Sequence, residues 1–190
     1  MKIRRVDIHG FRGIRSLEWI VGGDCACLVG PGDSTKTTIL DAIELVLSPR
    51  WNVQFDDTDF FDANIEEPIA IAVTVGDLPS DFKSDAKFGY LTRGWTTAGQ
   101  LRDEPGDDDE LVLTIELRVD QSLEPTWVVA TDRSPDGREI GRRDRDRIGC
   151  LRLTDYVDRQ LSWSRGSALS RLTGKTENLT GILADAARAA

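Results

Sequence analysis

The feature that most constrains the fold of this chain is a run of small residues at positions 30–38, GPGDSTKTT. A short apolar run at 26–29 precedes it, and apolar residues recur at helical spacing from Lys36 to Leu47. Strand, small-residue loop, Lys-Thr pair and helix are together the context of a phosphate-binding loop. In such a loop the backbone N–H groups and the helix dipole converge on a phosphate. The sequence therefore predicts a loop that binds the phosphates of ATP.

The last residues of this loop have predicted chemical roles. Lys36 is expected to reach the β- and γ-phosphate oxygens, and the Thr37 hydroxyl is expected to ligate Mg²⁺. Thr35 stands where the motif G-x-x-x-x-G-K-[ST] has glycine, and a side chain is sterically costly there if the backbone needs a positive φ. The alternative is a glycine-rich turn that only caps the helix. The residues predicted to bind the nucleotide are Gly30, Pro31, Gly32, Asp33, Ser34, Thr35, Lys36, Thr37 and Thr38.

Composition limits the partners that the chain can have. Its 190 residues fit one domain, and a formal net charge of −9 lacks the basic footprint of a nucleic-acid-binding protein. Any DNA contact is therefore expected to be local, or to come through a larger assembly. Cys25, Cys27 and Cys150 lack metal-ligand spacing, and we expect the first two to be inert thiols on a buried strand. The absence of a long apolar run or a signal peptide predicts a cytoplasmic protein with no membrane partner.

Strands and a helix are expected around the loop. The helix should run for about twelve residues from Lys36 and end near Ser48-Pro49, because proline cannot continue it. Residues 10–13 predict a turn that makes a hairpin of the first two strands, and residues 54–62 predict a loop or short helical turn. Besides the apolar run at 26–29, strands are expected at 2–9, 14–20, 68–75, 111–119 and 126–131.

The rest of the chain carries weaker signals. Residues 77–109 are rich in Gly, Pro and Asp without a sustained period, which predicts a mobile, irregular insertion outside the core. Residues 142–147 alternate Arg and Asp, as is typical of a solvated face, and 150–153 predict a brief strand. From 154 to 190 the pattern becomes helical. We therefore expect residues 1–190 to be a single, partial domain in which 154–190 begins a helical lobe.

Several stretches resemble a known family. IHGFRGI at 8–14, LVGPGDS at 28–34 and KTTILDAI at 36–43 resemble the N-terminal lobe of ABC-type ATPases of the RecF/SMC class. The nearest relatives by this resemblance are the OLD family of ATP-dependent nucleases, which LSPRWN at 47–52 and the stretch at 161–172 also resemble. The resemblance implies an α/β P-loop NTPase lobe of the ABC type. Its sheet would be mixed, with an extra antiparallel β-region and a C-terminal helical segment.

The resemblance also implies further site residues. In that class a Phe-Arg pair after the first strand lies near the nucleotide, which implies that Arg12 binds it; the alternative is that Arg12 anchors a turn. A Q-loop glutamine contacts Mg²⁺ and the attacking water where the β-lobe meets the helical lobe. Gln160 is the candidate by position, both for catalysis and for the metal, and Gln54 is a weaker one. The alternative for Gln160 is an ordinary solvent-facing helix residue.

Other elements of that family are absent from the sequence. No Walker B strand ending in Asp-Glu exists, and Val128–Arg133 is only a poor imitation of one. Neither a Leu-Ser-Gly-Gly-Gln signature nor a Toprim-like acidic cluster is found. In the family the Walker B and signature elements belong to the C-terminal half. The carboxylates Asp56, Asp57, Asp59 and Asp62 are more typical of a solvated acidic loop than of a metal site.

Three functions compete on these grounds. The first is the ATP-binding lobe of an ABC-type ATPase that serves DNA-repair or phage-defence nuclease machinery. It would act as a homodimer or with a C-terminal ATPase/nuclease half, and would hydrolyse ATP only when that half is supplied in cis or in trans. The second is a nucleotide-sensing or dimerisation module that does not hydrolyse. The third is a small P-loop kinase, although in such kinases the P-loop strand normally comes first.

Overall fold

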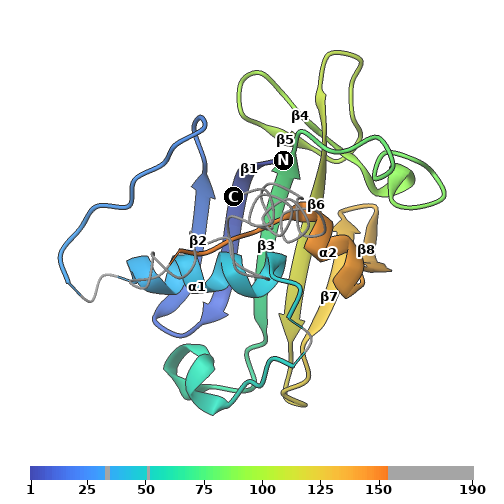
Figure 1. Ribbon diagram of the computed structural model, residues 1–190. Helices are drawn as coiled ribbons and strands as arrows, with labels where there is room; N and C mark the ends of the chain where they lie inside the picture. Colours follow the sequence, from blue (N-terminus) through green and yellow to red (C-terminus); the bar gives the residue numbers. More distant parts are fainter. Residues whose placement is uncertain (33–34, 51, 154–190) are drawn as a thin grey trace, which may run out of the picture. The chain divides into compact units, whose positions relative to one another are not determined.

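The computed structural model describes residues 1–32, 35–50 and 52–153, so the helices expected within 154–190, together with Gln160, lie outside the described residues. The chain divides into two units, Met1–Cys150 and Leu151–Ala190, and the first contains every described helix and strand. Along the chain these elements are β1 (Lys2–Phe11), β2 (Ile14–Ile20), α1 (Lys36–Leu47), η1 (Asp57–Asp59), η2 (Phe61–Ala63), β3 (Ile69–Gly76), η3 (Gly89–Leu91), β4 (Arg93–Trp95), β5 (Leu101–Arg102), β6 (Glu110–Val119), β7 (Thr126–Thr131), β8 (Ser134–Glu139) and α2 (Arg142–Ile148) (Figure 1).

One antiparallel sheet organises the first unit. Its strand order is β2-β1-β3-β6-β4-β5, while β7 pairs with β6 and β8 with β7. Every pairing between the described strands is antiparallel, so the mixed sheet expected from the sequence is not found in this part of the chain. The reason lies in the crossover through α1. It joins β2 to β3, which run in the same direction, but β1 lies between them and pairs with both.

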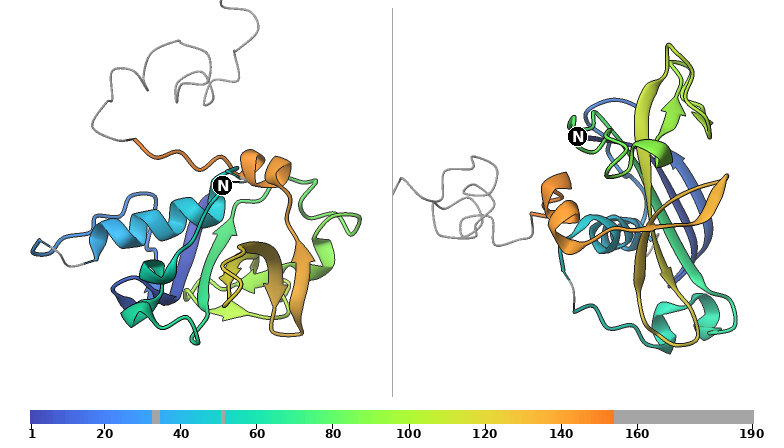
Figure 2. Two further views of the ribbon diagram at one scale, coloured as in Figure 1. Left: turned by 90° about the horizontal axis from the view of Figure 1, so that it is seen from below. Right: turned by 90° about the vertical axis from the view of Figure 1, so that its right-hand side faces the viewer.

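The core lies between one face of this sheet and α1. Val6 on β1 and Val73 on β3 are cross-strand partners, and both are fully buried. Helix α1 turns Ile39, Ala42 and Val46 toward them, a spacing that gives a helix one apolar stripe. Figure 2 shows α1 and α2 on the same side of the sheet. Among the described residues, no helix is long and apolar enough to span a bilayer.

Most of the expected regular elements are confirmed. The strands expected at 2–9, 14–20, 68–75, 111–119 and 126–131 correspond to β1, β2, β3, β6 and β7. Helix α1 begins at Lys36 and has Ser48 as its C-cap, directly before Pro49. Within residues 54–62 the chain forms the short helical turns η1 and the start of η2.

The prediction of a strand at 26–29 is wrong. The segment 25–30 forms no regular structure, and Cys25 and Cys27 are exposed rather than buried. A strand needs a neighbour for its N–H and C=O groups, and no described strand pairs with this segment. The brief strand expected at 150–153 is likewise absent, and these residues have no regular structure.

The first part of the segment 77–109 contributes to the core, contrary to the expectation that the segment lies outside it, whereas residues 104–108 are exposed. It contains η3, β4 and β5, and β4 pairs with β6. Phe82 and Leu91 are buried within the main hydrophobic cluster. Arg133 holds the segment to the β7–β8 turn by donating to the carbonyl oxygens of Tyr90 and Thr92 at 3.0 and 2.8 Å. The sequence signal is weak because the buried anchors follow neither a helical nor a strand period.

Candidate functional site

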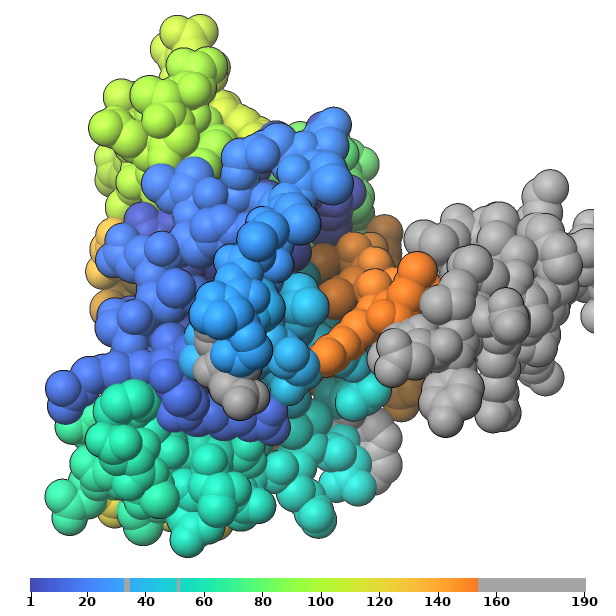
Figure 3. Space-filling model, turned by 90° about the vertical axis from the view of Figure 1, so that its left-hand side faces the viewer, coloured from blue at the N-terminus to red at the C-terminus, as the bar shows by residue number. Residues whose placement is uncertain are grey.

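The described residues of the predicted phosphate loop, 30–32 and 35–38, lie at the surface of the first unit, between β2 and the first turn of α1 (Figure 3). Thr35 is the N-cap of α1 and has φ 60° and ψ 6°, the left-handed conformation that glycine adopts readily. No acidic side chain lies in the first turn of the helix, and the side chain of Thr35 makes no capping hydrogen bond. Because the first N–H groups of a helix have no partner within it, this end of α1 attracts an anion.

Lys36 bends back over the loop that precedes it. Its Nζ donates to the carbonyl oxygen of Gly30 at 3.0 Å and also to that of Pro31. An ammonium group can exchange a carbonyl oxygen for a phosphate oxygen, which carries more negative charge. Thr37 is exposed, whereas Thr38 is partly buried, and Gly32 has open space around it. Asp33 and Ser34 lie outside the described residues.

The turn between β1 and β2 packs directly against the end of this loop. A Cβ atom placed on Gly13 would lie 3.2 Å from Cγ2 of Thr35, which is tighter than ordinary van der Waals contact. Even the smallest side chain at this position would therefore press on the residue that precedes Lys36. This contact brings the Phe-Arg-Gly sequence of the turn beside the phosphate loop.

Arg12, the residue before Gly13, joins this turn to two other elements. Its Nη1 donates to Oδ2 of Asp41 on α1 at 2.8 Å, and its Nε donates to Oδ1 of Asp59 on η1 at 2.9 Å. Its guanidinium also lies 4.8 Å from the ring centroid of Phe11. Arg12 therefore anchors the turn, one of the two roles considered from the sequence. Its side chain is still 42% exposed at the surface beside the loop.

The acidic segment that follows α1 uses its carboxylates for local structure. Asp56 caps η1 by accepting the backbone N–H of Thr58 at 2.9 Å, and hydrogen bonds from the Thr58 hydroxyl and N–H lower the pKa of Asp56. Asp59 completes this capping box and also binds Arg12. Within the described residues no group of three His, Cys, Asp or Glu side chains is arranged to hold a metal ion. Gln54 is exposed just before this segment.

The opposite end of α1 is held by two side chains that the sequence analysis missed. Trp127 Nε1 donates to the carbonyl oxygen of Leu45 at 3.0 Å. The guanidinium of Arg145 donates to the carbonyl oxygens of Ser48 and Arg50 at 2.9 and 3.2 Å, and it lies 4.0 Å from the ring centroid of Trp127. Arg145 is only 3% exposed, and this burial lowers its pKa to about 10. The alternation of Arg and Asp at 142–147 gave no sign that one arginine is buried.

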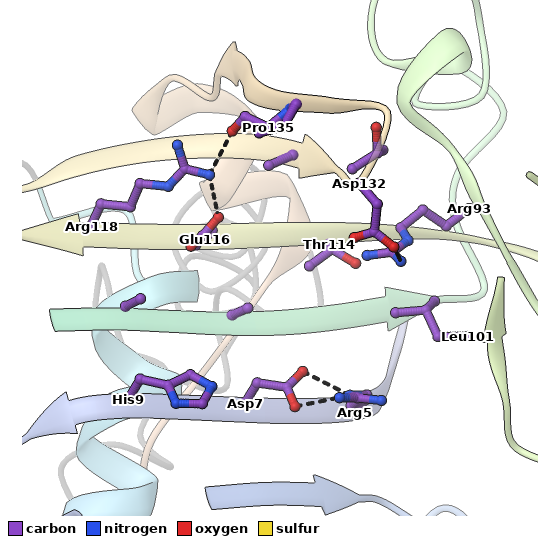
Figure 4. Close-up of a pocket in the computed structure, with 14 residues that line it drawn as sticks. Arg5, Asp7, His9, Arg93, Leu101, Thr114, Glu116, Arg118, Asp132 and Pro135 are labelled. Carbon is purple, nitrogen blue, oxygen red and sulfur yellow. Dashed lines mark hydrogen bonds and ion pairs between the residues drawn. The ribbon is translucent and has the colours of Figure 1, made fainter. Parts of the chain in front are cut away.

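The sheet face that α1 does not cover carries a polar groove with a volume of about 580 Å³ (Figure 4). Its floor is formed by small side chains of β3, such as Ala72, with Asp7 and Glu116 as the cross-strand neighbours of that alanine. Asp7 accepts from Arg5 Nε at 2.8 and 2.9 Å, and Glu116 pairs with Arg118. Since these carboxylates are balanced by arginines within the groove, it offers no net positive charge to a polyphosphate. The loop before α1 is the better candidate.

Comparisons with known proteins found partial similarity, either over part of the chain or at low sequence identity. A family model described as a protein of unknown function (DUF2813) matches residues 1–93, which include the loop and α1. No curated protein matches the chain. A structure described by ATP-driven dimerization and DNA-stimulated activation of SMC ATPases is 17% identical, with a TM-score of 0.47, over 76% of this chain and 75% of that one. The crystal structure of an SmcHead bound to the C-winged helix domain of ScpA is 18% identical, with a TM-score of 0.44, over 76% of this chain and 38% of that one.

Proposed function

We propose that this chain is the nucleotide-binding lobe of an ABC-type ATPase and that it binds Mg²⁺-ATP at the loop before α1. One observation carries the proposal. A residue in the left-handed conformation, Thr35, stands directly before a helix whose first turn begins with Lys36 and Thr37 and holds no acidic side chain. Loop, lysine and helix N-terminus are the three parts that a polyphosphate needs.

Each part of the loop then has a role. Backbone N–H groups at the start of α1 bind the phosphates, and Lys36 exchanges its loop carbonyl partners for the β- and γ-phosphate oxygens. Thr37, whose side chain is exposed, offers its hydroxyl to Mg²⁺. When bound, Mg²⁺ supplies charge neutralisation at the phosphates. Arg12 holds the β1–β2 turn in place against the loop through Asp41 and Asp59.

Hydrolysis is proposed to require a C-terminal half, supplied in cis or in trans. Two features of the described residues support this. The apolar segment 26–29 has no strand partner, and its Val29 is 88% exposed. On α1, Leu40 is 47% exposed although it belongs to the helix that follows the loop. A second half that adds a strand beside 26–29 would pair its backbone groups and cover these side chains.

A nucleotide sensor without hydrolysis is the second candidate. Asp132, the acidic residue that ends the nearest imitation of a Walker B strand, pairs with Nη2 of Arg93 at 2.8 Å. This pairing gives one of its carboxylate oxygens a structural partner, although the side chain is 76% exposed. Service to DNA repair or phage defence, and kinship with the OLD nucleases, are expectations that rest on the sequence resemblance, as is dimerisation.

The proposal is tested by calorimetric titration of the chain with Mg²⁺-ATP. A charge-assisted contact of this kind is worth about 1.5–3 kcal/mol, so Lys36→Ala should weaken binding roughly ten- to hundredfold. Lys83→Ala is the matched control, because Lys83 is an exposed lysine outside the loop. Absence of binding heat at millimolar nucleotide, or equal losses in both variants, would refute the site.

A further inference from the structure

Helix α1 is tied to the rest of the unit at both ends, and only one end is the proposed nucleotide site. At its C-terminal end the side chains of Trp127 and Arg145 bind the carbonyl oxygens of Leu45, Ser48 and Arg50. Arg145 belongs to α2, the last described helix before residue 151. Its guanidinium therefore connects the end of α1 to α2, the last helix of the first unit.

We infer that Arg145 is a positioning residue for the phosphate loop: by fixing the C-terminal end of α1 to α2, it makes nucleotide binding and the docking of α2 depend on each other. The inference rests on the proposed function, because it concerns the regulation of the same site. Arg145 would thus influence nucleotide binding although it lies at the other end of α1 from the loop.

The mechanical argument follows from the length of α1. A helix of 12 residues is roughly 18 Å long. A tilt of about 5° around its centre would move its first residue by about 0.8 Å, which is enough to weaken hydrogen bonds that tolerate only a few tenths of an ångström. Arg12 holds Asp41 in the second turn, and the contacts of Trp127 and Arg145 hold the end of the helix that is farthest from the loop.

The partners of Arg145 explain why an arginine is required. It has no carboxylate partner in the described structure, and its Nε is buried without a hydrogen bond. Its charge is balanced by two carbonyl oxygens near the negative end of the α1 dipole and by the face of Trp127. Only a planar group with several donors can stack on a ring and bind two carbonyl oxygens together. Lysine can reach one of these partners but not all three.

Coupling of this kind is reciprocal. If docking of α2 favours the loop conformation that binds nucleotide, then nucleotide must favour the docked state of α2 by the same factor. The amide groups of Asp144 and Arg145 donate to the carbonyl oxygen of Gly141 at the start of α2. They report on docking because a helix of 7 residues is not stable in water without its packing partners, so these hydrogen bonds open when α2 undocks. Hydrogen exchange at these amides should therefore slow when the loop is filled.

The experiment compares Arg145→Lys with Arg143→Lys, an exposed arginine on the same helix. Affinity for Mg²⁺-ATP is measured by calorimetry well below each melting temperature, and exchange of the α2 amides is measured with and without nucleotide. We expect Arg145→Lys to weaken binding about three- to tenfold and to abolish the nucleotide-dependent slowing at α2. Arg143→Lys should behave as the wild type in both measurements.

The outcomes separate this inference from the proposed function. Wild-type protein that binds no nucleotide refutes both. Wild-type binding with unchanged affinity in Arg145→Lys, even if that variant melts earlier, assigns Arg145 a purely structural role and overturns the inference alone. If Arg145→Lys does not fold, exchange in the wild type still decides. Nucleotide that binds without slowing the α2 amides rules out the coupling.

Discussion

Arg12 Nη1 and Asp41 Oδ2 lie 2.8 Å apart and join the β1–β2 turn to the second turn of α1. The same turn touches Thr35 through Gly13, so the ion pair spans the two structures that flank the proposed nucleotide site. Asp41 is 25% exposed and Arg12 is 42% exposed, which places the pair at the surface, where water and salt screen it. Its importance is therefore geometric more than energetic.

A double-mutant cycle of Arg12→Ala and Asp41→Ala should give a coupling energy of about 0.3–1 kcal/mol in urea unfolding, because partly exposed ion pairs contribute in this range. The effect should shrink as salt is raised. Lys2 and Asp24 form a more exposed pair at 2.7 Å and serve as the control, with a smaller expected coupling. A coupling energy indistinguishable from zero at low salt would mean that the two residues do not hold the turn to α1.

Thr35→Gly should tighten Mg²⁺-ATP binding. A left-handed backbone costs an L-residue about 1–2 kcal/mol, and this cost lowers the fraction of time that the loop spends in the competent conformation. Removing the cost should improve affinity by at most about five- to thirtyfold, measured by calorimetry.

Thr35→Ala separates the two effects of that change. Alanine removes the Cγ2 contact with Gly13 but keeps a Cβ atom at positive φ, so it should improve affinity much less than glycine. Weaker binding by Thr35→Gly would show that the loop is adapted to threonine and that backbone strain does not limit affinity.

Gly10→Ala should lower the free energy of unfolding by about 2–3 kcal/mol. Gly10 has φ +66°, and a Cβ atom there would lie 2.9 Å from the carbonyl oxygen of Pro68 just before β3. Alanine at this position is therefore strained in its backbone, and its Cβ atom would push β1 away from the residue that precedes β3. Gly22→Ala is the control, since nothing lies within 4 Å of its Cβ position, and it should change stability by less than about 0.5 kcal/mol. Equal stability of the two variants in urea unfolding would contradict this assignment.

Local patterns explain which elements could be predicted from the sequence. Strands β1 and β6 alternate apolar and polar residues over part of their length, and β3 is an apolar run that follows a proline and ends at a glycine. Helix α1 combines an apolar stripe with a proline just after its end. Each of these patterns is local, because it can be recognised within a few consecutive residues of the sequence. Strand β8 was missed because its sequence, SPDGRE, has the composition of a turn. Among the described strands it pairs with β7 alone, and an edge strand tolerates proline.

Long-range contacts explain what could not be predicted. The residues of the candidate loop follow from a motif, but the contact of Gly13 with Thr35 depends on how a hairpin folds over it. Burial of Arg145 depends on a tryptophan from another strand and on carbonyl oxygens at the end of α1. The unpaired segment at 26–29 shows the reverse case. An apolar run predicts a strand, but a strand forms only where another offers its hydrogen bonds.

The isolated chain should bind ATP but hydrolyse it slowly or not at all. Positioning and electrostatics supply most of the acceleration in phosphoryl transfer, so a site without a carboxylate to support Mg²⁺ and without a base to orient water lacks much of the catalytic power. Among the described carboxylates, Asp132 is paired with Arg93, and Asp56 and Asp59 are engaged in the η1 cap. The assay is phosphate release at saturating ATP, with Lys36→Ala run beside the wild type to expose contaminating ATPases. Supplying a C-terminal half in cis or in trans should raise the rate. Multiple turnovers by the chain alone at ordinary ATPase rates, lost in Lys36→Ala, would reveal a complete catalytic site, and Asp132→Asn would then be the first variant to measure.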